Sequence, residues 1–157
     1  MSALGAALRP MPIPTLQVLR RDPAAQAFMT LRVAFTVAPI LFGVDKFANV
    51  LTNDWTRYLS SQFNDIIPGN AAQAMHAVGV VEIVAGLVVA LSPRFGAVLV
   101  AAWLGGIIVN LLLVGGYGDI ALRDFGLLLG ALTLARLATA FPRDEATRLS
   151  PAGSPTR

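Results

Sequence analysis

The hydrophobic positions of this chain fall into four long stretches separated by short polar segments. The stretches cover residues 28–47, 71–91, 95–114 and 120–140. A helix of about 20 residues is roughly 30 Å long, which matches the hydrocarbon core of a lipid bilayer. The pattern therefore predicts an all-α fold, a membrane four-helix bundle whose transmembrane domain is residues 28–140.

The loop between the first two stretches, residues 48–70, is the longest connection. Four of its residues recur at helical spacing with polar residues between them: Trp55, Tyr58, Leu59 and Phe63. Aromatic side chains are enriched where a membrane meets water. The spacing therefore predicts a short interfacial helix in this first outer loop, with Trp55 and Tyr58 as packing residues or interface anchors.

The basic residues indicate how the helices are oriented. With the amino terminus in the cytoplasm, seven arginines lie on the cytoplasmic side and three basic residues lie outside or at outer helix ends. The positive-inside rule favours this arrangement. We therefore predict a multi-pass protein of the inner (plasma) membrane of a bacterium, with cytoplasmic tails at residues 1–27 and 141–157. Arg32, near the start of the first span, is expected to extend back to the lipid headgroups.

Composition excludes several function classes. Hydrophobic residues make up 55% of the chain and charged residues only 13%, which is too apolar for an ordinary soluble domain. The arginines lie at the ends of apolar stretches and not on one basic face, so nucleic acid is not an expected partner. The chain has no cysteine and one histidine. Disulfides, thiolate metal sites and two-histidine haem ligation are therefore excluded, and no metal site is predicted.

Glu82 is a carboxylic acid near the middle of the second predicted span. Inserting such a group costs about 2.5 to 3.5 kcal/mol, so it needs a partner on another helix or must stay protonated. We expect that partner to be Arg123 or Asn110. Glu82 is then either a structural lock between helices or a group that accepts protons or binds a headgroup. Gly79 and Gly86 lie on the same helix face and predict close packing against a neighbouring helix.

The other polar residues at the spans each have two interpretations. Asp119 lies four residues before Arg123 and predicts a local ion pair, although Arg123 could instead hold Glu82 or a ligand oxygen. His76 is either a proton relay or quinone contact, or an interfacial residue. Asn110 is either an interhelical hydrogen-bonding residue or a ligand contact. Lys46 either forms a surface pair with its neighbour Asp45 or belongs to an outer polar cluster.

Two further predictions concern packing. Gly126 and Gly130 have the spacing of a second close contact between helices. Trp103, in the third span, is interpreted like Trp55 and Tyr58 as a packing residue or an interface anchor, and stacking on a cofactor is the alternative for all three.

Several short motifs resemble the DoxX-like family of small four-helix membrane proteins. They are Gly43-x-x-Lys46 at the end of the first helix, Glu82 followed by Gly86 in the second, the turn Ser92-Pro93-Arg94, and the opening of the fourth helix from Asp119 to Gly126. The resemblance covers roughly residues 31–137. It implies a four-helix bundle associated with redox systems, because relatives are linked to thiosulfate:quinone oxidoreductase and to membrane complexes that handle oxidative stress.

From these observations we expect a membrane subunit or accessory protein of a quinone-linked redox or oxidative-stress system that is not catalytic on its own. Glu82, His76 and Arg123 are the candidates for proton exchange, and the expected ligand-binding residues are Glu82, Asn110, Arg123, Asp119 and Lys46. No cofactor is evident, and a quinone is the candidate ligand. Expected partners are membrane lipid, other membrane subunits and further copies of the chain. The alternatives are a non-catalytic scaffold or assembly protein and an oligomeric small transporter.

Overall fold

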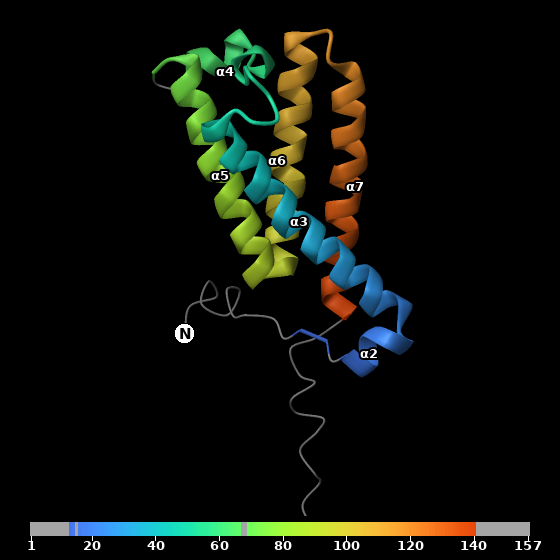
Figure 1. The fold of residues 1–157 in the computed structure, drawn as a ribbon. Helices are drawn as coiled ribbons and strands as arrows, with labels where there is room; N and C mark the ends of the chain where they lie inside the picture. The colour runs from blue at the N-terminus through green and yellow to red at the C-terminus, as the bar shows by residue number, and fades with distance from the viewer. Residues whose placement is uncertain (1–12, 15, 67–68, 141–157) are drawn as a thin grey trace, which may run out of the picture.

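The computed structural model describes residues 13–14, 16–66 and 69–140, and this part of the chain contains helices and no β-strand. The all-α prediction is therefore confirmed for the described residues. The helices are shown in Figure 1: α2 (Leu16–Arg21), α3 (Pro23–Ala48), the 3₁₀ helix η1 (Thr56–Tyr58), α4 (Ser61–Ile66), α5 (Ala71–Leu91), α6 (Pro93–Val114) and α7 (Gly118–Ala140).

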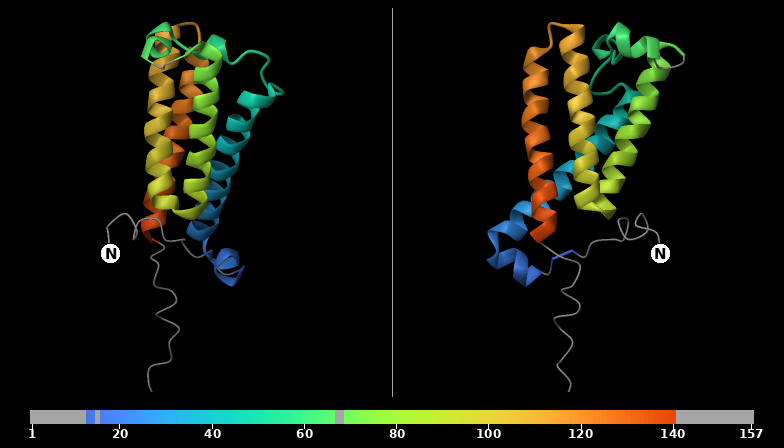
Figure 2. Two further views of the ribbon diagram at one scale, coloured as in Figure 1. Left: turned by 90° about the vertical axis from the view of Figure 1, so that its left-hand side faces the viewer. Right: turned by 180° about the vertical axis from the view of Figure 1, so that it is seen from behind.

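Four long helices lie side by side and run alternately in opposite directions. The main contacts are between α3 and α5 and between α6 and α7, and α5 also packs against α6. Helix α3 crosses the others obliquely, from the last turns of α7 to the upper half of α5 (Figures 1 and 2). Residues 49–66, here called the cover segment, lie across one end of the helices. We call this the covered end, and the opposite end, with the tight turn at Ser92, the turn end.

The helix boundaries lie close to the predicted ones. Helix α5 begins and ends at the predicted residues, whereas α3 begins five residues before the predicted start at residue 28. The reason is Asp22, whose side chain accepts a hydrogen bond from the Ala24 amide at 2.9 Å, with Pro23 in the first helical position. The predicted interfacial helix is instead two short ones, η1 and α4. The predicted tail 141–157 lies outside the described residues.

The apolar core lies in the half of the molecule near the turn end. It combines a few large side chains, among them Phe28, Val89 and Leu134, with many alanines from α5, α6 and α7. Arg32 is also buried here, with 9% of its surface exposed, and its Nη2 donates to the Ala90 carbonyl at 2.6 Å. The predicted extension of Arg32 to the headgroups is therefore wrong. This side chain satisfies a carbonyl in the last turn of α5, which has no partner within its own helix.

Three helices, α3, α5 and α6, are long and apolar enough to cross a membrane. The fourth predicted span, α7, is more polar because it contains Asp119, Arg123, Asp124 and Arg136. All four helices nevertheless carry large exposed hydrophobic side chains. On α7 these are Leu122, Phe125, Leu127, Leu129 and Leu132, each at least 44% exposed.

Candidate functional site

Helices α3 and α5 approach so closely that their backbones touch at glycines. A Cβ atom on Gly43 would lie 2.6 Å from the Gly79 carbonyl oxygen, and one on Gly86 would lie 2.7 Å from the Thr36 carbonyl oxygen. No side chain larger than hydrogen fits at these positions without moving a helix. The predicted close packing at Gly79 and Gly86 is confirmed, and α3 is the partner helix. The close helix contact predicted at Gly126 and Gly130 is only half correct. Gly130 packs against Phe35, but Gly126 faces open space.

This contact brings Lys46 of α3 and Glu82 of α5 together. The Lys46 Nζ donates to Glu82 Oε2 at 2.6 Å, and the two residues are only 6% and 8% exposed. Side chains on a helix lean toward its amino terminus. Because α3 and α5 are antiparallel, the two side chains lean toward each other along the contact. The prediction that Arg123 or Asn110 pairs with Glu82 is therefore wrong, and the partner is Lys46.

The cover segment closes over Lys46 from the other side. The Lys46 Nζ lies 4.1 Å from the centre of the Trp55 ring, a cation–π contact. Asp45 Oδ2 accepts a hydrogen bond from Trp55 Nε1 at 3.0 Å, and Asp45 Oδ1 accepts from the amides of Val50 and Leu51. Of the two interpretations of Lys46, the surface pair with Asp45 is therefore wrong, and Lys46 belongs to a polar cluster, which is buried. Asp45 holds the cover segment above it.

Asn110 of α6 anchors the second half of the cover segment. Its Oδ1 accepts from the Ser60 amide at 2.9 Å, and its Nδ2 donates to the Tyr58 carbonyl at 2.5 Å. The Tyr58 ring also contacts Tyr117, just before α7, with 5.0 Å between ring centres. The predicted interhelical hydrogen bond of Asn110 is therefore wrong. This side chain bonds the backbone of a loop and ties it to the bundle.

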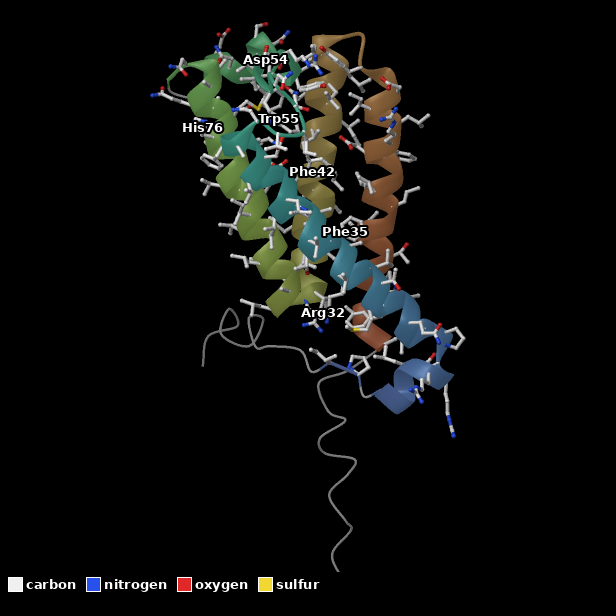
Figure 3. The ribbon with its side chains drawn as sticks, viewed as in Figure 1. Arg32, Phe35, Phe42, Asp54, Trp55 and His76 are labelled. Atoms are coloured by element: carbon white, nitrogen blue, oxygen red, sulfur yellow. The ribbon has the colours of Figure 1, made fainter. Side chains whose placement is uncertain are left out.

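Two of the three residues predicted for proton exchange lie away from Glu82. Arg123 pairs with Asp119 at 3.3 Å, and both side chains are largely exposed, so the predicted local ion pair is confirmed. Such exposed pairs contribute little stability. His76 is exposed and its ring stacks on Phe47, with 4.9 Å between ring centres. Figure 3 shows His76 at the covered end, where Trp55 and Asp54 also lie, whereas Arg32 lies toward the turn end.

Asp124 was not among the residues predicted for the site, and it is more buried than its neighbour Arg123. Asp124 is half-buried, and its carboxylate acts electrostatically on Glu82. A sequence signal for this position exists, because Asp124 has the helical spacing of the buried residues Ala121 and Ala131. The Lys46 ammonium therefore has more than one carboxylate near it. Glu82 pairs with it, Asp45 precedes it in α3 and is also buried, and Asp124 acts from α7.

Asp54 organises the start of η1 in the exposed part of the cover segment. Its Oδ1 accepts from the Thr56 hydroxyl at 2.6 Å and from the Thr56 amide at 2.9 Å. These hydrogen bonds favour the ionised carboxylate, with the hydroxyl contributing most, and they lower the pKa of Asp54 below its usual value.

Among the described residues, no three histidine, aspartate or glutamate side chains gather in the way a metal ion would require. Comparisons of the chain with protein-family models, with curated proteins and with solved structures found no match in any of the three. Function is therefore inferred from the geometry around Lys46 and Glu82 and from the resemblance in the sequence.

Proposed function

We propose that this chain is a multi-pass membrane protein with all four long helices, α3, α5, α6 and α7, in the bilayer. The exposed leucines and phenylalanine of α7 continue the apolar surface of the other helices, as contact with lipid requires. Its charged residues suit this position, because Asp119 and Arg123 lie in the first two turns, Arg136 lies near the last, and Asp124 is turned inward. Figure 1 shows that α2 lies at the turn end and that α7 has its last residues there. This agrees with two cytoplasmic termini in a bacterial inner membrane.

Within this membrane protein, the Lys46–Glu82 pair is the ligand and proton site of a quinone-linked redox or oxidative-stress system, which the chain serves as a membrane subunit. The observation that carries this proposal is a buried ion pair inside an apolar bundle. Ionisable groups in membrane spans are costly and usually mark a functional site. Apolar residues of similar volume would generally be at least as stable at the same place.

The residues of the site fit a quinone headgroup. Ring oxygens of a quinone accept hydrogen bonds, and an ammonium group has three donors. One donor of Lys46 is used by Glu82, which leaves others for a ligand oxygen. The Trp55 ring next to Lys46 supplies a flat apolar surface beside which a flat ring could lie. A bound quinone would supply the redox chemistry, while the protein holds the ring and the protons near it.

A scaffold or assembly role is the second candidate, and one observation favours it. The polar groups proposed for the site already have partners within the chain, namely Lys46 with Glu82, Asn110 with the cover segment and Arg123 with Asp119. Such contacts fix helix packing without any ligand.

Quinone binding by the protein in mild detergent distinguishes the two candidates. The probe is a short-chain ubiquinone analogue, titrated into wild type, Glu82→Gln and Arg123→Gln. Glutamine keeps the shape of Glu82 and can still accept from Lys46, so this variant is expected to fold. We expect wild type and Arg123→Gln to bind equally and Glu82→Gln to bind about tenfold more weakly. Absence of binding to folded wild type would favour the scaffold.

A further inference from the structure

Trp103, in the middle of α6, carries a buried polar atom with no partner. Its Nε1 is shielded from solvent and makes no hydrogen bond in the structure. The indole N–H is a donor only, and buried donors in folded proteins nearly always have an acceptor. An unpaired buried donor is costly, and an acceptor supplied by a bound ligand would remove that cost.

The register of α5 and α6 places Trp103 at the level of Glu82. Gly96 of α6 lies directly against Val89 of α5, since a Cβ on Gly96 would be 2.5 Å from the Val89 nitrogen. Glu82 is seven residues from Val89, and Trp103 is seven residues from Gly96. Seven residues are almost two full turns and about 10.5 Å of rise, so both lie in one layer across antiparallel helices.

The same spacing places Trp103 beneath the cover segment. Asn110, which binds the backbone of that segment, follows Trp103 by another seven residues and so lies on the same face of α6. The indole therefore lies on the α6 face that runs from the contact with α5 to the underside of the cover segment. Glu82 lies at the same level on α5, where Lys46 of α3 pairs with it.

We propose that the Trp103 indole N–H binds a ring oxygen of the quinone-class ligand held at the Lys46–Glu82 site. This inference depends on the proposed function, and it names a specificity-determining residue within it. One carbonyl oxygen of the ligand supplies the acceptor that Nε1 lacks. The ligand also contacts Lys46 through a ring oxygen and Trp55 through the face of its ring. A hydrocarbon ring of the same size would leave the donor unpaired. Trp103 therefore selects for rings that carry oxygen.

The test substitutes Trp103→Phe, which keeps an aromatic ring and removes the N–H. Because that N–H has no partner without ligand, we expect the thermal midpoint to stay the same or rise slightly. The short-chain ubiquinone analogue should bind about tenfold more weakly than to wild type. Val109→Ala, on an exposed position of α6, serves as the control and should leave both quantities unchanged.

A spectroscopic measurement reports the hydrogen bond itself. The chain has two tryptophans, so the ¹⁵N-labelled wild type gives two indole N–H signals in NMR spectra. The signal that is missing from the spectrum of Trp103→Phe belongs to Trp103. We expect this signal to move downfield when the ubiquinone analogue is added and not when the corresponding alkylbenzene is added.

The outcomes separate the two proposals. If wild type binds the analogue but Trp103→Phe binds it equally well and the Nε1–H signal does not move, the role of Trp103 is overturned and the quinone site stands. If folded wild type binds no analogue, both are overturned.

Discussion

The two ends of the molecule are held together by different forces. Near the turn end, large side chains such as Phe28 and Leu134 are fully buried among alanines, and Arg32 contributes a bond to the Ala90 carbonyl. At the covered end the helices are joined through Lys46 and Glu82, and the cover segment is tied down by side chains of α3 and α6.

If the proposed function is correct, this difference separates the residues that stabilise the fold from those that bind the ligand. The apolar half has the close packing from which most bundles gain their stability. The polar half uses an ion pair that apolar residues could replace without loss of stability. We therefore expect substitutions near the turn end to change only folding, and some substitutions at the covered end to change ligand binding while leaving the fold intact.

The largest effect is expected from Lys46→Met, which leaves the Glu82 carboxylate buried without its cation. The free energy of unfolding, measured by denaturant titration in mixed micelles, should fall by about 3 to 5 kcal/mol. The double variant Lys46→Met/Glu82→Met should return to within about 1 kcal/mol of wild type. Equal losses in the single and double variants would show that the pair does not act as a unit.

Leu134→Ala tests the apolar half. This side chain is fully buried, so its truncation should cost about 2 to 4 kcal/mol of unfolding free energy, with no change in quinone affinity. Leu132→Ala, two residues away and 44% exposed, is the control and should cost less than about 0.5 kcal/mol. A loss of quinone binding in folded Leu134→Ala would contradict the separation of the two halves.

Gly43→Ala tests the helix contact that positions the ion pair. The added Cβ would press against the Gly79 carbonyl, so α3 and α5 must separate at a cost of about 1 to 3 kcal/mol. Gly106→Ala is the matched control, because nothing lies within 4 Å of its Cβ position in α6. Gly106→Ala should raise the free energy of unfolding by about 0.5 to 1 kcal/mol. Equal effects at the two glycines would mean that the contact is not tight.

The smallest effect concerns pH and the cover segment. The folded pKa of Asp54 is lowered, so its contribution to stability is complete above the ordinary aspartate pKa of about 4 and is lost as the pH falls through the folded value. We expect the Thr56 amide signal in NMR spectra to shift over that acidic range in wild type and to stay fixed in Asp54→Asn. If the Thr56 amide signal shifted over the same pH range in both proteins, the titrating group would not be Asp54.

The helices could be predicted well because their signals are local. The ends of α5 follow from the turn residues around it, and the structure has Asn70 and Gln73 in a reciprocal capping box at its start. The small residues Gly79 and Gly86 also identified the packing face correctly. Predictions that depended on solvent exposure were less accurate, and Arg32 is an example. A long basic side chain near a helix end can extend toward the solvent or turn back to bind a backbone carbonyl.

The candidate site could be predicted only in part. Glu82 was identified because a carboxylate in an apolar stretch needs a partner wherever it lies. The choice among Lys46, Arg123 and Asn110 depends on how far each helix is rotated and tilted, and residue spacing along one helix does not determine that. Asp124 was left out of the predicted site, and Trp103 was interpreted as a packing residue or an interface anchor, for the same reason. What surrounds each of them depends on the helices that face it.

The sequence by itself determined that this chain forms long apolar helices, to within a few residues where they begin and end, and that one buried acid must be compensated. These properties depend on each residue and its near neighbours. Only the tertiary structure decided that the compensating cation is Lys46 and that residues 49–66 cover it. That decision follows from the glycine contact between α3 and α5, which sets the distance between two side chains 36 residues apart in the sequence.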